Sequence, residues 1–211
     1  MPIALLAALI ALSTIAQGQS FDLKSLENKA RAGDVLAQVE LGSRYDFGEG
    51  VRRSAKKAEH WYRLAAAGGN AHAQNSIGSM LQERRKYDEA FTWFEKAAAQ
   101  AHPHGTNNLA YLHDLGLGVP QDRLKAKELY LAAAKLSWGE AMWNLANMAA
   151  LGQAGPVDWF ATCVWTQRAL NSEQAVNGIL RNRAEQGMNE LKARLSSEEI
   201  DRCRAEANTP L

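Results

Sequence analysis

The sequence predicts an all-α fold, a right-handed α/α solenoid of stacked antiparallel helix pairs with capping helices at both ends. The main observation is an internal repeat, in which Trp61, Trp93, Leu129 and Trp165 follow one another at intervals of 32, 36 and 36 residues. Each repeat also carries apolar residues three or four positions apart, which is the spacing of one helix face. The net charge of +1 lacks the basic excess that nucleic-acid-binding proteins use against phosphates, so no nucleic-acid partner is expected.

Residues 1–18 are expected to be an export signal. The segment from Pro2 to Ala16 carries no charge, and its apolar run IALLAALIAL is followed by small residues at Ala16 and Gly18, as at a cleavage site. The run is shorter than the ~20 apolar residues that cross a bilayer, so no membrane span is expected after cleavage. We therefore expect an exported protein, in a bacterial periplasm.

Residues 19–34 are the next predicted element, an N-terminal capping helix. The segment DLKSLENKARAGD matches only the second helix of a repeat. A lone half-unit at the start of a solenoid would cover the open face of the first full helix pair.

Residues 35–171 contain four repeats, each predicted to be a helix pair. In the first repeat Ala37, Leu41 and Tyr45 form one apolar stripe, and Gly42 gives a neighbouring helix room to approach closely. The second helix carries a matching stripe at Ala58, Trp61, Tyr62 and Ala65. A break at the segment GGN, positions 68–70, is expected to end this helix and begin the next pair. Because one pair cannot bury its stripe alone, the pairs should stack.

A specific motif runs through the repeats, A-x3-L-G-x2-Y-x2-G-x-G-V followed by K-A-x2-W-Y-x2-A. In the first repeat it occupies Ala37, Leu41, Gly42, Tyr45, Gly48, Gly50, Val51, Lys57, Ala58, Trp61, Tyr62 and Ala65. This pattern resembles the Sel-one-like repeat (SLR) family of the tetratricopeptide-like superfamily, over about residues 32–171. The second repeat lacks the glycine loop, and the fourth has Ala154 in place of the second loop glycine.

Residues 172–211 are expected to form a C-terminal helical cap. Its last helix, in SSEEIDRCRAEA, should be capped by Ser196 or Ser197 and has glutamates in its first turn. In an exported protein, Cys163 and Cys203 are candidates for a disulfide between this cap and the last repeat, and two buried thiols are the alternative. Such a bridge would contribute about 3–4 kcal/mol.

The histidines do not predict a metal site. His102, His104, His113 and Asp114 are the best constellation, but Pro103 makes a turn between the first two, and the spacing matches no zinc signature. The sequence also lacks a phosphate loop, a nucleophile elbow and a metalloprotease helix. We therefore expect neither a cofactor nor enzymatic activity.

A binding groove is predicted on the helix face opposite the apolar stripe, because this face is concave in tetratricopeptide-like solenoids. Its positions are rich in Asn, His and aromatic residues, with Tyr111 and Trp143 as expected anchors. The expected backbone clamps are Asn75, Asn107 and Asn147. The predicted groove consists of Asn75, Ser79, His104, Asn107, Tyr111, Asp114, Glu140, Trp143 and Asn147. An ordinary polar helix face is the alternative.

The function predicted from these features is that of an exported, monomeric adaptor that binds a protein or peptide in its groove. One alternative is an enzyme or ligand-binder that acts on cell-wall peptide or glycan, with His104, Asp114 and Glu140 as its candidate residues. Another is a permanent scaffold subunit of an envelope complex, which would expose large apolar patches.

Overall fold

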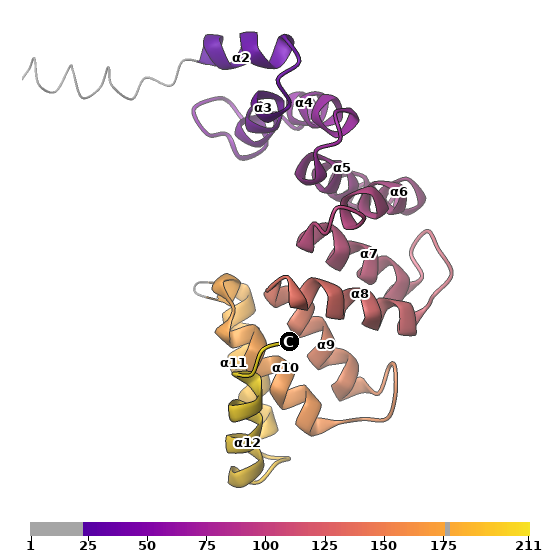
Figure 1. Cartoon of the computed structure of the whole chain (residues 1–211), viewed down its shortest axis with the longest axis vertical. Coiled ribbons are helices and arrows are strands. Elements are labelled where there is room, and N and C mark those ends of the chain that lie inside the picture. Colours follow the sequence, from indigo (N-terminus) through magenta and orange to yellow (C-terminus); the bar gives the residue numbers. More distant parts are fainter. Residues whose placement is uncertain (1–22, 176–177) are drawn as a thin grey trace, which may run out of the picture. The chain divides into compact units, whose positions relative to one another are not determined.

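The computed structural model describes residues 23–175 and 178–211, and the regular structure in these ranges is helical throughout (Figure 1). The expected export signal, 1–18, lies outside the described residues. The α-helices are α2 (Leu23–Arg31), α3 (Val35–Phe47), α4 (Ala55–Ala67), α5 (Ala71–Glu83), α6 (Tyr87–Ala98), α7 (Pro103–Leu115), α8 (Arg123–Lys135), α9 (Gly139–Leu151), α10 (Trp159–Asn171), α11 (Ile179–Leu191) and α12 (Ser197–Ala207). Within the described part of the chain, no helix is long and apolar enough to cross a bilayer.

The chain divides into two compact units between Gly68 and Gly69. In the first unit α2 packs against α3, and α3 packs against α4. In the second unit each helix from α5 to α10 packs against the next, and both α11 and α12 pack against α10. The pairs α3/α4, α5/α6, α7/α8 and α9/α10 are the predicted helix pairs, which confirms the α-solenoid fold.

Glycines in the first helix of a pair let the second helix approach closely. A Cβ atom added at Gly42 would lie 2.5 Å from the ring of Tyr62, and one added at Gly78 would lie 2.5 Å from the ring of Phe94. Both rings are fully buried. The close approach predicted for Gly42 is therefore confirmed, and the same contact recurs in the second pair.

The turns that lead into α3, α5, α7 and α9 share one backbone conformation. Gly33, Gly69, Ala101 and Ser137 occupy the same place in these turns and have φ values of +94°, +88°, +53° and +61°. The residue that follows is the N-cap of the next helix in each case. At Asp34, Asn70 and His102 a side-chain atom accepts a hydrogen bond from a backbone N–H in the first turn. The break at 68–70 is therefore one instance of a joint that links successive helix pairs.

The last helix, α12, begins with a well-formed N-cap and is joined to α10 of the last helix pair by two cysteines. Ser196 begins α12 with a reciprocal capping box, in which its N–H donates to Glu199 and its hydroxyl accepts from the Glu199 N–H. Cys163 of α10 and Cys203 of α12 lie at disulfide-bonding distance, with Cα atoms 5.9 Å apart. Both cysteines are fully buried in an apolar cluster that includes Leu191. The cap therefore joins the solenoid through α10.

Candidate functional site

One face of the second unit is built from the first helices of successive pairs, with α11 alongside. α5 contacts α7, and α9 contacts α11. Amide side chains also link these helices: the Asn108 side chain donates to the Asn75 oxygen at 3.0 Å, and the Asn144 side chain donates to the Asn107 oxygen at 3.1 Å. We call this surface of α5, α7, α9 and α11 the groove face.

The amide links change the roles predicted for two asparagines. Asn75 is 4% exposed and Asn107 is 8% exposed, and each already holds an amide of the neighbouring helix. A buried amide that is bonded within the protein has little surface left for a peptide backbone. The clamp role predicted for Asn75 and Asn107 is therefore corrected, and these residues position α7 and α9. Asn147 stays partly exposed.

A pocket of about 330 Å³ opens between α5 and α7 on the groove face. We call it the α5–α7 pocket. The predicted residues Ser79, His104 and Tyr111 line it, together with Gln82 and Asn108, which are not in the predicted groove set. Tyr111 is 37% exposed, so its ring is accessible. The buried Oε1 atom of Gln82 has no hydrogen-bond partner within the described ranges, so an acceptor without a donor lies in this wall.

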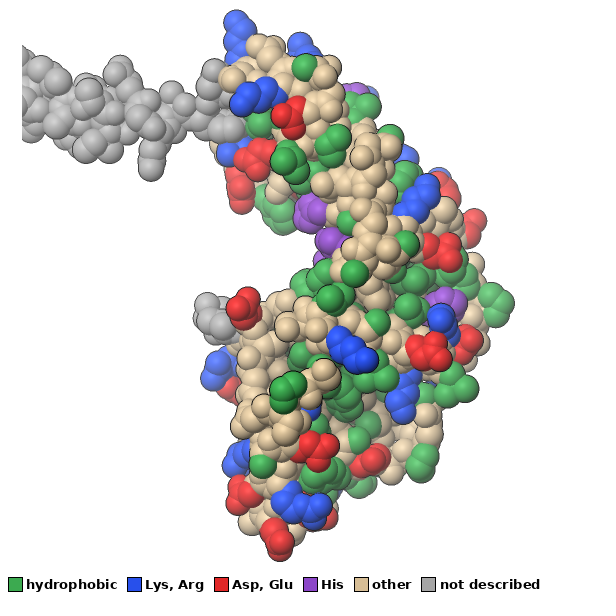
Figure 2. Space-filling model, viewed as in Figure 1, with side chains coloured by type: hydrophobic (Ala, Val, Ile, Leu, Met, Phe, Trp, Pro, Cys, Tyr) green, Lys and Arg blue, Asp and Glu red, His purple; other side chains and the backbone are tan. Residues whose placement is uncertain are grey.

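Burial keeps the histidines beside this pocket neutral at pH 7. His104 stacks on Trp138 with ring centroids 4.8 Å apart, and its Nδ1 atom lies 3.3 Å from the Asn75 amide nitrogen. Burial, with a smaller effect of His72, lowers the pKa of His104. Burial and the charges of His72 and His104 lower the pKa of His102 to about 4. In the space-filling view, histidine side chains (purple) lie at the hollow on the left of the view and also at the right edge of the molecule (Figure 2).

A second pocket, of about 230 Å³, opens between α9 and α11. We call it the α9–α11 pocket. The predicted residues Trp143 and Asn147 line it, with Trp159 of α10 and with Gly187 of α11. A Cβ atom added at Gly187 would lie 3.2 Å from the Trp143 ring. The glycine therefore lets the Trp143 ring approach α11 closely, where the ring forms part of the pocket wall.

The three residues proposed for an enzymatic site have separate partners. Glu140 forms a two-oxygen ion pair with Arg183 of α11, at 2.7 and 2.9 Å. Asp114 lies 3.9 Å from Arg123, and burial raises its pKa while Arg123 opposes this effect. His104 contacts Asn75 and Trp138, as described above. Across the described ranges, no group of three or more His, Cys, Asp or Glu side chains could hold a metal ion.

Helices α5, α7 and α9 carry little charge, whereas α11 brings arginines and glutamates to the groove face. Helices α5, α7 and α9 contain no lysine or arginine, and their carboxylates are Glu83, Asp114 and Glu140. Two of these carboxylates, Asp114 and Glu140, pair with arginines of other helices. The α5–α7 pocket combines amide, hydroxyl and imidazole groups with the Glu83 carboxylate, and the α9–α11 pocket has Glu190 and Arg194 beside its aromatic rings.

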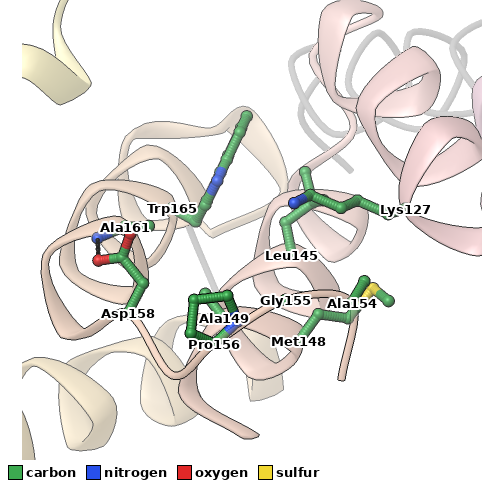
Figure 3. A pocket seen from close by; sticks show the side chains of 10 residues that line it. All are labelled: Lys127, Leu145, Met148, Ala149, Ala154, Gly155, Pro156, Asp158, Ala161 and Trp165. Carbon is green, nitrogen blue, oxygen red and sulfur yellow. Dashed lines mark hydrogen bonds between the residues drawn. The ribbon is translucent and has the colours of Figure 1, made fainter. Parts of the chain in front are cut away.

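A third pocket, of about 230 Å³, lies between α8, α9 and α10 (Figure 3). Lys127 of α8, Met148 of α9 and Trp165 of α10 line it, with the loop that contains Pro156. The Asp158 carboxylate at its edge accepts a hydrogen bond from the Ala161 N–H at 2.8 Å and so caps α10. None of the predicted groove residues lines this pocket, so it is separate from the groove face.

The sequence reasoning missed Asn108, Trp159 and Gly187 for two reasons. Asn108 and Asn144 are 36 residues apart and so occupy equivalent positions in two successive repeats. The repeat could have identified them, but the predicted groove was built from only one helix position per turn. Gly187 belongs to the segment assigned to the C-terminal cap, where the repeat pattern has ended. No repeat-based argument could place α11 beside α9.

Comparison with known proteins gives consistent matches. The sequence model of the Sel1 repeat matches residues 35–70, 71–102 and 103–138. The crystal structure of a Sel1 repeat protein from Oxalobacter formigenes is 36% identical, with a TM-score of 0.53, and the match covers 60% of this chain and 98% of that one. The helix pair α9/α10 continues the same packing beyond the matched repeats.

Two longer proteins are also similar. A protective antigen of uropathogenic Escherichia coli strains, which displays an SLR fold, superposes with a TM-score of 0.79 at 24% identity, and the match covers 90% of this chain and 42% of the antigen. A sel1-like repeat-containing protein of Acanthamoeba polyphaga mimivirus is 32% identical over 68 residues, which is 32% of this chain and 13% of the viral protein. The chain thus spans less than half the length of each.

Proposed function

Because the chain belongs to the Sel1 repeat family, we propose that it is a non-catalytic adaptor that binds an extended segment of a partner protein on its groove face. The observation that carries this proposal is the presence of two pockets on one face, each with aromatic side chains beside polar groups. Protein interfaces are enriched in such aromatic residues.

The contact roles follow from accessibility. Tyr111 is the exposed aromatic residue of the α5–α7 pocket, and Trp143 forms a wall of the α9–α11 pocket. Asn108 and Asn147, which line these pockets, replace the buried Asn75 and Asn107 as proposed partners of a peptide backbone. Amide side chains can donate and accept at once, as a backbone requires.

We also propose that the protein is exported. The cysteine pair supports this, because structural disulfides persist in oxidising compartments. The apolar N-terminal run supports it independently.

A comparative pull-down from envelope extract tests the adaptor function. The chain from Gln19 is immobilised beside a Tyr111→Ala/Asn147→Ala variant, and the retained proteins are identified by mass spectrometry. Leu124→Ala is the matched control, because Leu124 is 68% exposed on α8 and lines neither pocket of the groove face. We expect a partner that the wild type and the control retain and the double variant loses. Equal retention by all three proteins would refute the groove assignment.

A further inference from the structure

We infer that the α5–α7 pocket binds an arginine side chain of the partner segment. This inference rests on the proposed function and names the chemistry of one contact on the groove face. Glu83 of α5 is the counter-ion of the guanidinium group, and the Gln82 side-chain oxygen is a second acceptor. The rings of Tyr87 and Tyr111 form the aromatic part of the same site.

The charge of the pocket favours a cation. Glu83 lines the pocket together with uncharged side chains, because burial lowers the pKa of His104 and keeps this histidine neutral at pH 7. The Glu83 side chain is exposed and forms no ion pair within the described ranges. A carboxylate without a partner attracts a basic group, and the described pocket residues include no lysine or arginine that could bind an acidic one.

The buried acceptor in the wall of the pocket needs a donor. The Gln82 Oε1 atom has no hydrogen-bond partner among the described residues. A buried acceptor without a donor is costly, and a donor that a ligand supplies removes this cost. Because Gln82 and Glu83 are consecutive and both line the pocket, one ligand group with several N–H donors can bind both.

A guanidinium group suits this pocket better than an ammonium group does. It is planar, carries five N–H donors and stacks on aromatic rings, whereas an ammonium is a compact and strongly hydrated point charge. Tyr111 is 37% exposed and Tyr87 is partly buried, so aromatic surface is available beside the carboxylate. Contact between the cation and such a ring adds to the attraction of Glu83. The pocket therefore favours arginine over lysine.

Basic residues near Glu83 in the sequence do not occupy the pocket. Arg84, Arg85 and Lys86 follow it directly, and none of them lines the pocket. Lys86 forms an ion pair with Glu89 of α6 at 2.6 Å. These cations weaken the field of the Glu83 carboxylate at long range. Recognition of arginine therefore depends on direct contact inside the pocket.

A displayed library of random twelve-residue peptides tests the assignment. It is selected in parallel on the oxidised wild-type chain, on Glu83→Gln and on Glu95→Gln. Glu95→Gln is the matched control, because it removes the same charge from an exposed position of α6 that lines neither pocket of the groove face. We expect arginine to be enriched at one aligned position on the wild type and on the control, and not on Glu83→Gln.

Citrulline separates the charge of the arginine from its shape. In the best selected peptide, citrulline replaces the enriched arginine and keeps a planar side chain without the charge. This change should raise the Kd at least tenfold for the wild type and less than twofold for Glu83→Gln, measured by fluorescence anisotropy. Circular dichroism establishes that each variant is folded.

Gln82→Met tests the second acceptor. The variant should raise the Kd of the arginine peptide at least threefold, because the guanidinium group loses an acceptor. Its urea midpoint should not fall below that of the wild type, because the Gln82 oxygen has no donor to lose among the described residues. An unchanged Kd would contradict the role of Gln82.

The outcomes separate this inference from the proposed function. Enriched peptides without arginine, or with lysine in its place, would overturn the inference, and the groove adaptor would stand if Tyr111→Ala/Asn147→Ala still abolishes their binding. Equal binding of the arginine peptide to the wild type and to Glu83→Gln would also overturn the inference. If no peptide is enriched, the inference fails and the pull-down decides the adaptor function alone. Peptides that neither Glu83→Gln nor the groove double variant weakens would count against both.

Discussion

At the scale of single residues, the joints between helix pairs show how one backbone conformation tolerates different side chains. The joint needs a positive φ, which glycine adopts freely and other residues adopt at a cost. Glycine fills this position at Gly33 and Gly69, but alanine and serine fill it at Ala101 and Ser137. The surrounding helix pairs therefore impose the conformation even where the local sequence disfavours it.

Exchanging glycine and alanine between two joints should change stability in opposite directions. Gly69→Ala is expected to lower the free energy of unfolding by about 1 kcal/mol, because φ is +88° there. A Cβ atom at Gly69 would have no neighbour within 4 Å, so the loss reports backbone conformation alone. Ala101→Gly is expected to raise the free energy of unfolding by up to about 1 kcal/mol. Urea denaturation measures both, and changes of the same sign would contradict this account.

The histidine cap of α7 should make stability depend on pH. His102 has a pKa of about 4 in the folded chain against about 6.5 for a histidine in the unfolded chain, so between these values the unfolded chain binds more protons. The free energy of unfolding should therefore fall as the pH falls from about 6.5 to 4 and stay level above that range. The lowered pKa values of His72 and His104 act in the same direction.

A conservative variant separates His102 from the other histidines. His102→Asn keeps a side-chain acceptor at the N-cap and removes one titrating group, so it should be less sensitive to pH between 6.5 and 4. His102→Ala should lose about 1 kcal/mol at pH 7, because the Gly105 N–H loses its acceptor. Urea midpoints at several pH values measure both effects, and an unchanged pH slope in His102→Asn would refute the assignment.

At the scale of elements, α11 completes the groove face without belonging to a repeat. Arg183 of α11 holds Glu140 of α9, and Gly187 receives the Trp143 ring. Helix α12 packs against α10 and is joined to it by the pair Cys163 and Cys203. The cap therefore shapes a pocket as well as closing the end of the solenoid.

Removing the cysteine pair should destabilise the C-terminal end. Cys203→Ala opens a loop with a sequence separation of 40 residues, and the loop-entropy model gives a loss of about 3–4 kcal/mol. The reduced wild type should show a similar loss, and reductant should not affect the variant further. Thermal unfolding with and without dithiothreitol measures this, and an oxidised wild type no more stable than the variant would count against it.

At the scale of the whole chain, the sequence predicted the helix pairs well because their signals are local and repeat. The Gly42 contact with Tyr62 follows from spacing and residue size alone. The groove was predicted less well, because helix periodicity cannot tell an exposed asparagine from one bonded to the next helix. The side chains of Asn75 and Asn107 accept hydrogen bonds from amides of the next helix. Whether such amides meet depends on how far one helix is shifted along its axis relative to the next, and the sequence pattern does not show this shift. Helix α11 follows no repeat, so its place beside α9 needed the structure.

Local stability should vary along the chain with the number of packed neighbours. Helix α2 packs against α3 and buries fully only Ala30, whereas α10 packs against α9, α11 and α12. Amides of α2 should therefore exchange with deuterium first and those of α10 last, because opening α10 disturbs several helices. Hydrogen exchange with mass spectrometry measures the order, and exchange of α10 as fast as that of α2 would contradict it.

The balance of charge on the groove face has a kinetic consequence. Helices α5, α7 and α9 contain no lysine or arginine, and α11 carries two arginines and two glutamates, so little long-range attraction would steer a partner toward the pockets. The association rate of a bound segment should then stay near the unsteered range of about 10⁵–10⁶ M⁻¹s⁻¹ and change little with ionic strength. Discrimination between partners would arise after encounter, in how long each one stays bound.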